Sequence, residues 1–354
     1  MSVFVITYFA LLIATSCAAA YWNQRGPFLA LFSLTLVSFV LGIIGGAGAL
    51  RFVAITAAMI AFAAGTSFAF REFLVLLTWG NLSKELKTAP LTAAFGMFVI
   101  FTYIIAGVFA PWIAPFGESQ VIASSFAPAD EDMILGADQL GRDMFSRIIY
   151  GARNTVGLAL TATIAAFVIG ALAGLIAATK GGWFDQILGR IADIIMSIPS
   201  LIFALLMLSI FGPQTIVIIV AVAIIYAPRV FRLTRAVAGN VVVMDYIEAA
   251  KLRGEKTWYL IRREILPNST APLIAEFGLE FCFVFLLVAG LSFLGLGVQP
   301  PTADWGSMVR ENATLISFGE ITPLIPAAAI ALLTVAVNFV VDWMLFRSSG
   351  LKEQ

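Results

Sequence analysis

The stretch EAAKLRGEKTWYLIRREILP, residues 248–267, decides how this chain is organised. It gathers charged residues between two long apolar runs, in a sequence that is 61% hydrophobic and only 12% charged. The mean hydropathy of +0.99 over 354 residues is too high for a water-soluble domain, because polar residues must cover the surface of such a domain. We therefore predict an all-α, polytopic membrane protein in which this stretch forms a loop outside the bilayer.

Nine apolar runs are long enough to cross a membrane, since a hydrocarbon core about 30 Å thick takes roughly 20 helical residues. The first run could instead be a cleaved signal peptide or end at a lipidated Cys17. It has no basic residue before it and no Leu three places before the cysteine, so we interpret it as a helix. The nine runs cover residues 3–21, 28–49, 52–70 (with a possible extension to Trp79), 91–114, 154–179, 187–210, 215–233, 271–295 and 322–346.

The composition excludes several classes of function. The 21 basic and 21 acidic residues balance, which gives no indication of a nucleic-acid partner. Histidine is absent, and Cys17 and Cys282 both lie in apolar runs, so the sequence contains no zinc pattern, disulfide framework or Cys/His nucleophile. It also lacks a G-x-x-x-x-G-K-[ST] phosphate loop. We therefore expect a chain without a cofactor, a metal or an enzymatic activity of its own.

Basic residues near the helix ends set the predicted orientation, because basic loops stay in the cytoplasm. Residues 229–264 hold eight basic and four acidic side chains, which places this loop in the cytoplasm. Alternation of the last six helices then puts the C-terminus in the cytoplasm and, with three further helices in front, the N-terminus outside. The basic residues Lys84, Lys87, Lys180, Arg347 and Lys352 agree with this orientation.

The loop of residues 115–150 is then expected to face outward, and it is predominantly acidic. Within DQLGRDMFSRIIYG, residues 138–151, apolar residues recur at helical spacing and predict a helix that is half-buried in an interface. The arginines of this segment lie beside the membrane. Such a helix could seal the outer end of the bundle or dock a soluble partner, and the sequence leaves both interpretations open.

The opening stretch itself predicts two short helices on the cytoplasmic face. Asp245 and Glu248 resemble a capping box, so that a helix can start at Tyr246, and Gly254 provides a stop after about two turns. The small side chains of Ala249 and Ala250 would let another surface approach closely. Thr257 can open a second helix, which Leu266 and Pro267 would end. The alternative interpretation is a basic anchor lying on anionic lipid.

These residues resemble a known family. Glu248, Ala249 and Ala250, with Gly254 four residues later and Leu266-Pro267 beyond, match the EAA loop of ABC importer membrane subunits, although Glu264 stands where the general pattern has Ile. Three further motifs resemble the C-type permease subunit of dipeptide, oligopeptide and nickel importers. These are LGADQLGRDMFSRIIYGAR (135–153), SIPSLIFALL (197–206) and LSFLGLGVQPPTADWGSM (291–308).

The resemblance implies a six-helix type I ABC importer transmembrane domain over residues 81–346. Its outer loop would be residues 115–150 and its cytoplasmic EAA coupling loop residues 234–267. Three extra transmembrane helices in residues 1–80 would precede it, with an open role, and residues 347–354 would form a cytoplasmic tail. Such a permease resides in the bacterial inner membrane.

The resemblance also implies partners. These are a B-type permease in a heterodimer, two ATPase domains that hold ATP and magnesium, and a periplasmic or lipid-anchored solute-binding protein. The ATPase-coupling residues would be Glu248, Ala249, Ala250, Lys251, Arg253, Gly254, Leu266 and Pro267. The cargo would be a peptide or a related small solute, and the sequence does not say which one.

Two acids stand out inside the membrane. Glu276 and Glu280 lie one helical turn apart, about 13 and 20 Å beyond Pro267, which is too deep for easy contact with water. They could line the translocation path and favour cationic or amine-bearing cargo, or be protonated and bonded to a neighbouring helix. Asp193 and Asp342 lie nearer helix ends and are interpreted as structural. The SFLGLG run from Ser292 to Gly297 predicts a break, as an outer gate or as a plain helix end.

Two other functions remain as alternatives. An ion-gradient-driven secondary transporter would use the membrane glutamates as proton carriers, would act alone and would contain inverted repeats. A non-transporting membrane scaffold would recruit partners through its first three helices. The EAA loop argues against both.

Overall fold

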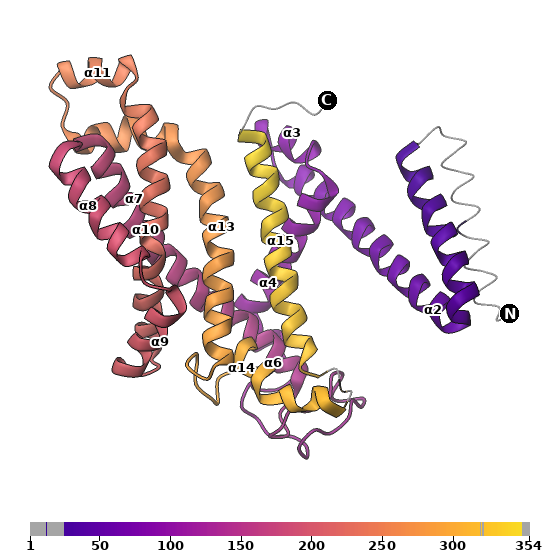
Figure 1. The fold of residues 1–354 in the computed structure, drawn as a ribbon. Helices are drawn as coiled ribbons and strands as arrows, with labels where there is room; N and C mark the ends of the chain where they lie inside the picture. The colour runs from indigo at the N-terminus through magenta and orange to yellow at the C-terminus, as the bar shows by residue number, and fades with distance from the viewer. Residues whose placement is uncertain (1–11, 13–24, 319, 321, 349–354) are drawn as a thin grey trace. The chain divides into compact units, whose positions relative to one another are not determined.

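The computed structural model of the chain describes residue 12, residues 25–318, residue 320 and residues 322–348 (Figure 1). The chain divides into two compact units, Met1–Lys87 and Thr88–Gln354, which are described one at a time. The first predicted span, residues 3–21, lies outside the described residues except for Leu12. So does the predicted tail after Ser348.

The first unit contains α2 (Arg25–Leu77) and the short α3 (Asn81–Lys87). The second and third predicted spans both fall in α2, whose ribbon turns back on itself in Figure 1. Its second part, Val53–Leu77, is long and apolar enough to cross a membrane, and it ends two residues short of Trp79. The first unit thus supplies at least one of the spans predicted for residues 1–80.

The second unit is built from helices, and the described residues of the chain contain no β-strand, only two isolated bridges in the loop before α6. Among the described residues, five helices of this unit pass as membrane spans, or six with a bent pair counted as one. Its elements are α4 (Leu91–Val108), α5 (Ala110–Ile113), α6 (Met144–Gly151), the π-helix η1 (Ala152–Val156), α7 (Gly157–Lys180), α8 (Gly182–Met196), α9 (Ser200–Phe211), α10 (Thr215–Val242), α11 (Asp245–Leu252), α12 (Thr257–Tyr259), the π-helix η2 (Leu260–Ile265), α13 (Leu266–Phe293), α14 (Trp305–Asn312), the 3₁₀-helix η3 (Ala313–Phe318) and α15 (Leu324–Ser348).

One predicted span is broken. The run 187–210 forms α8 and α9, which meet at an angle of 83°. Pro199 has no backbone N–H to continue the helix, and a proline pushes the residue before it, Ile198, out of helical geometry. The run predicted as one span is therefore two helices with a sharp bend between them.

The centre of the second unit is the contact between α7 and α10. Gly170 and Gly174, one turn apart on α7, let the backbone of α10 approach closely. A Cβ added at Gly170 would lie 2.4 Å from the carbonyl oxygen of Ala227, and one added at Gly174 would lie 2.8 Å from that of Phe231. Small residues at this spacing are typical of tightly packed membrane helices. The pair forms the frame on which α8, α9 and α13 pack.

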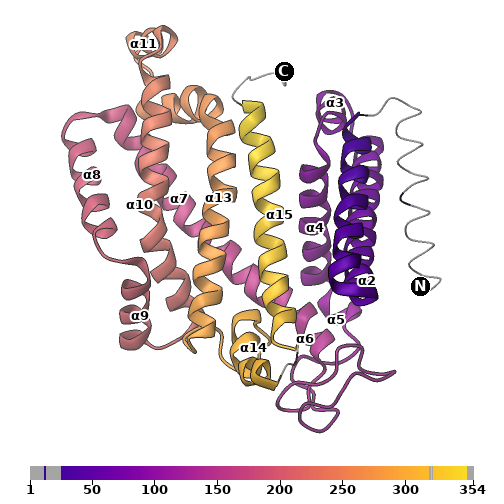
Figure 2. The same ribbon diagram turned by 45° about the vertical axis from the view of Figure 1, so that its right-hand side comes forward.

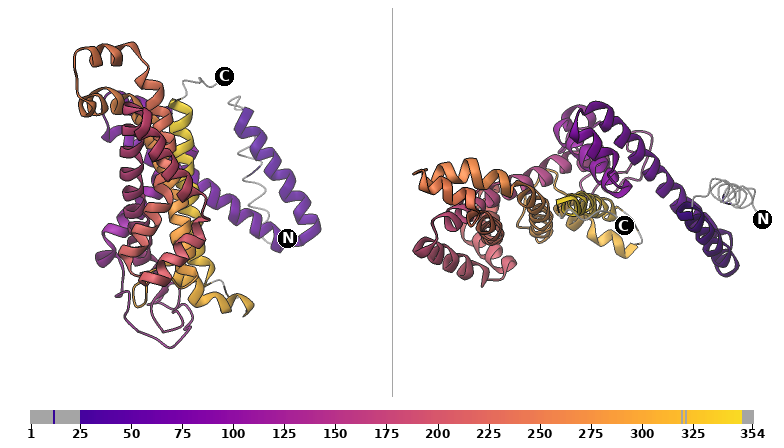
Figure 3. Two further views of the ribbon diagram at one scale, coloured as in Figure 1. Left: turned by 60° about the vertical axis from the view of Figure 1, so that its left-hand side comes forward. Right: turned by 90° about the horizontal axis from the view of Figure 1, so that it is seen from above.

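The bundle of the second unit has two ends, which we name after the helices found there. Figures 1 and 2 show α11 at one end, standing beyond the ends of α10 and α13, and α14 at the other. The left view of Figure 3 shows the same separation from another direction. In the sequence interpretation, the α11 end is cytoplasmic and the α14 end faces outward.

Candidate functional site

The start of α11 differs from the predicted capping box. Met244, with φ −75° and ψ 143°, is the N-cap, and helical geometry already begins at Asp245. Because Asp245 lies inside the helix, its carboxylate cannot act as the cap, and no side-chain cap hydrogen bond occurs at this helix start, which the structure describes in full. Asp245 and Glu248 instead occupy the first turn, where negative charge is favoured by the helix dipole.

The end of α11 is the glycine stop that the sequence predicts. Gly254 has φ +82°, a left-handed conformation that only glycine adopts without strain. Its N–H donates to the carbonyl of Lys251 at 2.9 Å, and the N–H of Glu255 donates to that of Ala250 at 3.2 Å. This pair of hydrogen bonds is a Schellman motif, which fixes the length of the helix.

The underside of α11 packs on the chain itself. Ile247 and Ala250 are fully buried and form a small apolar cluster with Leu260, Ile261 and Ile265. Of the two small side chains that were predicted to allow the close approach of another surface, Ala250 is covered by this cluster and Ala249 is exposed. The cluster attaches α11 to the start of the next span.

The outer face of α11 is open and mixed in character. Glu248, Ala249, Lys251 and Arg253 are all exposed. Beside them lie large apolar side chains that the sequence interpretation did not assign to the site: Leu252, Val243 and Trp258 are 84%, 78% and 59% exposed. Exposed apolar groups next to fixed charges are typical of a surface that a partner protein covers. The signal that could have identified them is the presence of aliphatic and aromatic residues in a loop outside the bilayer.

The second short helix does not end at Leu266 and Pro267. α12, η2 and α13 form one continuous helix, Thr257–Phe293, and Pro267 lies in the first turn of α13. The prediction of a stop at this proline was wrong because the preceding turn is a π-helix, Leu260–Ile265. A π-helical turn already departs from the i to i−4 hydrogen-bond pattern that a proline disrupts. Both Leu266 and Pro267 are exposed on the side of this helix.

The two membrane glutamates lie on α13 in different surroundings. Glu280 is 3% exposed, and its Oε2 has no hydrogen-bond partner among the described residues. Glu276 is partly exposed. Both interact electrostatically with Arg229 of α10, whose guanidinium lies 5.3 Å from the ring centres of Tyr226 and Phe283. That these acids line a translocation path stays a prediction.

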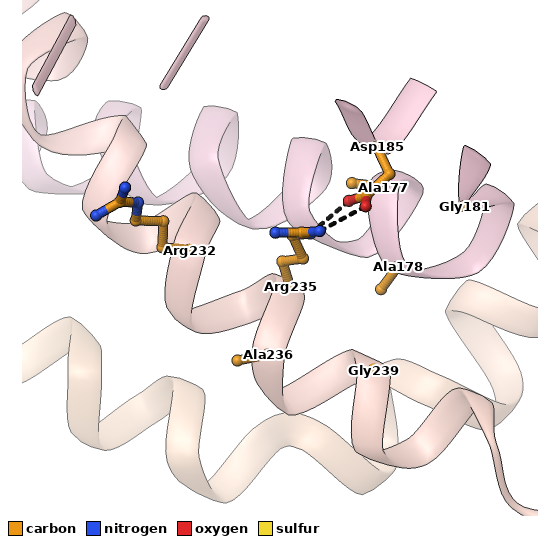
Figure 4. Close-up of a pocket in the computed structure, with 8 residues that line it drawn as sticks. All are labelled: Ala177, Ala178, Gly181, Asp185, Arg232, Arg235, Ala236 and Gly239. Carbon is orange, nitrogen blue, oxygen red and sulfur yellow. Dashed lines mark hydrogen bonds and ion pairs between the residues drawn. The ribbon is translucent and has the colours of Figure 1, made fainter. Parts of the chain in front are cut away.

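Further along α10, two arginines pair with acids of α8. Arg232 lies 2.6 Å from Asp193, so these two side chains form an ion pair. Arg235 pairs with Asp185, and Figure 4 shows this pair pointing across a hollow of about 480 Å³ between α7, α8 and α10. The sequence interpretation assigned no role to either arginine beyond its charge.

The α14 end carries a buried ion network. Nε of Arg142 lies 2.7 Å, and Nε of Arg147 3.2 Å, from Oδ2 of Asp138, and one terminal nitrogen of Arg142 lies 3.1 Å from Glu311. All four side chains are at least 93% buried. The segment predicted as a helix over 138–151 forms a helix only from Met144, after an Asp143 N-cap. Its arginines seal the bundle end from inside.

A second buried acid joins two helices at this end. The hydroxyl of Thr155 in η1 donates to Oδ1 of Asp304 at 2.8 Å, and the N–H of Ser307 donates to its Oδ2 at 2.9 Å. Burial raises the pKa of Asp304, while these donors oppose the rise. The indole N–H of Trp305 donates to the carbonyl of Ile148 at 3.0 Å. The SFLGLG run ends α13 at Phe293, as its predicted break requires.

Comparison with known proteins adds to this geometry. Residues 166–348 match a protein family described as "Binding-protein-dependent transport system inner membrane component". A dipeptide transport system permease protein DppC of Alkalihalophilus pseudofirmus is 34% identical over 77% of this chain and 89% of that protein. A di/tripeptide transport system permease protein DppC of Pseudomonas aeruginosa is 34% identical over 70% and 84%. A glutathione transport system permease protein GsiD of Pectobacterium atrosepticum is 31% identical over 77% and 91%.

Proposed function

The chain belongs to the family of binding-protein-dependent transport system inner membrane components, and on that premise we propose that it is one permease half of an ATP-driven peptide importer. The resemblance predicted from the EAA loop is confirmed, and so is the prediction of a transport subunit without enzymatic activity, since the relatives are transport permeases. The ion-gradient alternative is not favoured, because transport in this family depends on a binding protein.

Two features support the proposed partners: the sequence contains no phosphate loop for ATP, and α11 exposes charged and apolar side chains. A B-type permease completes the pathway as a heterodimer, and two ATPase domains hold ATP and magnesium. The observation that carries this proposal is the outer face of α11, which presents Glu248, Lys251 and Arg253 beside the apolar Leu252. This face fits a cleft on an ATPase domain better than a lipid surface, because it combines both signs of charge with uncovered apolar groups.

The proposed orientation puts the α11 end in the cytoplasm and the α14 end outside. Support comes from the eight basic residues between positions 229 and 264, because basic loops stay in the cytoplasm. A periplasmic or lipid-anchored binding protein then delivers cargo to the α14 end. The C-terminus is cytoplasmic and the N-terminus outside, in a bacterial inner membrane.

The proposed cargo is a short peptide. The relatives are named for dipeptides, di/tripeptides and glutathione, all of which carry an amine and a carboxylate. Glu276 and Glu280 are proposed to favour the amine. Glu276 is the more accessible of the two, and Glu280 lies buried one turn further along α13.

Coupling follows from the stiffness of the contact. ATP binding can drive transport only by favouring one of two states by several kcal/mol, so the contact between ATPase and permease must not yield. α11 meets this need because the Schellman motif fixes its end and the Ile247 cluster joins it to the start of the α12–α13 helix. Movement of the ATPase domains would thus move α13 and its glutamates.

The test is to purify the chain with its partner chains in lipid nanodiscs and in proteoliposomes, and to measure ATP hydrolysis and peptide uptake. Glu248→Lys should abolish the uptake of peptide per ATP hydrolysed while the protein stays in the membrane. Glu320→Lys, an equal change of charge on an exposed residue outside the α11 loop, is the matched control. A chain that purifies alone and moves peptide without ATP would overturn the proposal.

A further inference from the structure

Two ion pairs join the part of α10 nearest the α11 end to α8, and they are open on one side. The side chains of Arg232 and Asp193 are 56% and 48% exposed, and that of Arg235 is 46% exposed. α10 has 28 residues and is about 42 Å long, against a hydrocarbon core of about 30 Å. Arg232 lies about 15 Å and Arg235 about 10 Å from the end of α10 at Val242. Centring α10 in the hydrocarbon leaves about 6 Å of helix beyond it at each end, so both pairs lie at the edge of the bilayer on the α11 side.

Lipid cannot cover this face. A charged side chain exposed to hydrocarbon is costly, so charged residues of membrane helices face water, protein or a cavity. The helix that carries the acids is itself mostly open, because of the fifteen residues of α8, all of them described, only Ala192 is buried. The cover is therefore either a partner chain with matching charges or water.

The local shape favours water. The hollow of about 480 Å³ in front of Arg235 is lined by small residues that include Ala177, Gly181, Ala236 and Gly239 (Figure 4). An adjoining hollow of about 220 Å³ extends along α8 to Asp193. The two hollows leave room for a solute beside the charged groups. The two arginines and two acids thus border a polar space.

The chemistry of this space matches a zwitterion. Each arginine is held by one carboxylate, and the pairs are half-exposed, so they exchange with solvent at little net cost. A peptide with free ends brings one carboxylate and one ammonium, which can replace the protein's own pair without leaving any charge unpaired. A singly charged solute that replaced one partner would leave the other protein charge unpaired, and an uncharged solute brings no charge that could open the pair.

We propose that the α8–α10 face lines the water-filled translocation passage near its α11 end, where Arg232 receives the carboxylate of the cargo and Asp193 its ammonium as their own ion pair opens. This inference rests on the proposed function. It assigns the selection of free peptide ends to the permease itself, in addition to the binding protein.

The first test is the reaction of introduced cysteines with a membrane-impermeant thiol reagent, in the assembled transporter and in a chain with Cys17→Ser and Cys282→Ala. Ala236→Cys places a thiol in the hollow without touching an ion pair, and it should react about tenfold faster than Leu172→Cys, an exposed apolar site at similar depth on α7. Peptide cargo should slow the reaction. Equally slow reaction at both sites would overturn the proposal. So would protection of Ala236→Cys by anionic lipid vesicles but not by peptide, because the face would then bind lipid headgroups.

The second test uses the charge of the cargo. Three cargoes are compared for each variant: a tripeptide with free ends, its N-acetylated form and its C-amidated form. The uptake of each peptide by the variant is divided by the uptake of the same peptide by the unmodified chain. This ratio cancels the preference of the binding protein. Asp193→Asn should lower the uptake of the free tripeptide about tenfold relative to the N-acetylated one, the loss expected for one charge-assisted bond. Arg232→Gln should lower the uptake of the free tripeptide about tenfold relative to the C-amidated one. Asp193→Glu keeps the negative charge and should restore uptake of the free tripeptide.

Equal effects on all three peptides would show that the pair is only structural and would overturn the inference. Failure of the unmodified chain to import any peptide with ATP would instead contradict the proposed function. The two failures are therefore distinguishable in one set of vesicles.

Discussion

At the α14 end of the bundle charged side chains pair with one another inside the chain, whereas the charged side chains of α11 at the other end point outward. Asp138, Arg142 and Arg147 are almost fully buried, but Glu248 and Lys251 are exposed. The buried ion network at the α14 end satisfies its charges within the chain, whereas the exposed charges of α11 can bind a partner protein. The comparison teaches that the charges of this chain divide into those that hold it together and those that connect it to other molecules.

The largest effect on stability is expected at the closed end. Among the described residues, Asp138→Ala leaves two buried guanidinium groups with Glu311 as their one shared ion-pair partner, and it should lower the free energy of unfolding by about 3–5 kcal/mol. Denaturant unfolding in detergent micelles measures this loss. Glu131→Ala, an exposed acid in the same loop, is the control and should stay within about 0.5 kcal/mol. Equal losses in the two variants would contradict the division of charges.

A smaller loss is expected from packing at the same end. A Cβ added at Gly151 would lie 2.4 Å from Cδ1 and Nε1 of Trp305, so Gly151→Ala should cost about 1–3 kcal/mol. A Cβ added at Gly290 on α13 meets nothing within 4 Å, so Gly290→Ala should leave the free energy of unfolding unchanged or raise it by up to about 1 kcal/mol. The same unfolding measurement compares the two. A neutral Gly151→Ala would show that this end is looser than its contacts indicate.

At the open end the backbone matters more than the side chains. Gly254→Ala forces an alanine to φ +82°, which should cost about 1–2 kcal/mol and loosen the end of α11. Amide hydrogen exchange at Glu255 should speed up, because its N–H closes the Schellman motif. Gly254→Asn should cause a smaller loss of stability and a smaller increase in the exchange rate, since asparagine tolerates the left-handed conformation better than alanine does. Unchanged exchange in the alanine variant would mean that the motif does not define the helix end.

The smallest effect on stability is expected from the exposed charges of α11. Lys251→Ala should change the free energy of unfolding by less than about 0.5 kcal/mol. It should nonetheless reduce the peptide transported per ATP hydrolysed, because the side chain is proposed to contact the ATPase domain. A variant that lost stability but kept full transport would reverse the comparison between the two ends.

Much of this arrangement could be predicted from the sequence. Apolar runs of about 20 residues gave most of the described spans because the bilayer fixes their length. Gly254 predicted the end of α11, since few other residues tolerate its backbone angle. The EAA pattern identified the family before any comparison with other proteins.

The rest depended on contacts that local sequence patterns do not contain. The buried network joins Asp138 and Arg142 to Glu311, which lies far away in the sequence. Pro267 predicted a helix end, but a π-helical turn before it lets the helix continue. The small side chain of Ala250 predicted the close approach of another surface, and the surface that covers it belongs to its own loop. In each case a tertiary contact or an irregular turn overrode a local rule.

The most direct test of the central claim is the number of peptides taken up per ATP hydrolysed by the assembled transporter with and without Glu248→Lys. We predict that this ratio falls to the background of empty vesicles while the variant still inserts, folds and binds its partner permease. Glu320→Lys should leave the ratio unchanged. A normal ratio in the Glu248→Lys variant would contradict the role assigned to α11, and the open end of the bundle would need another explanation.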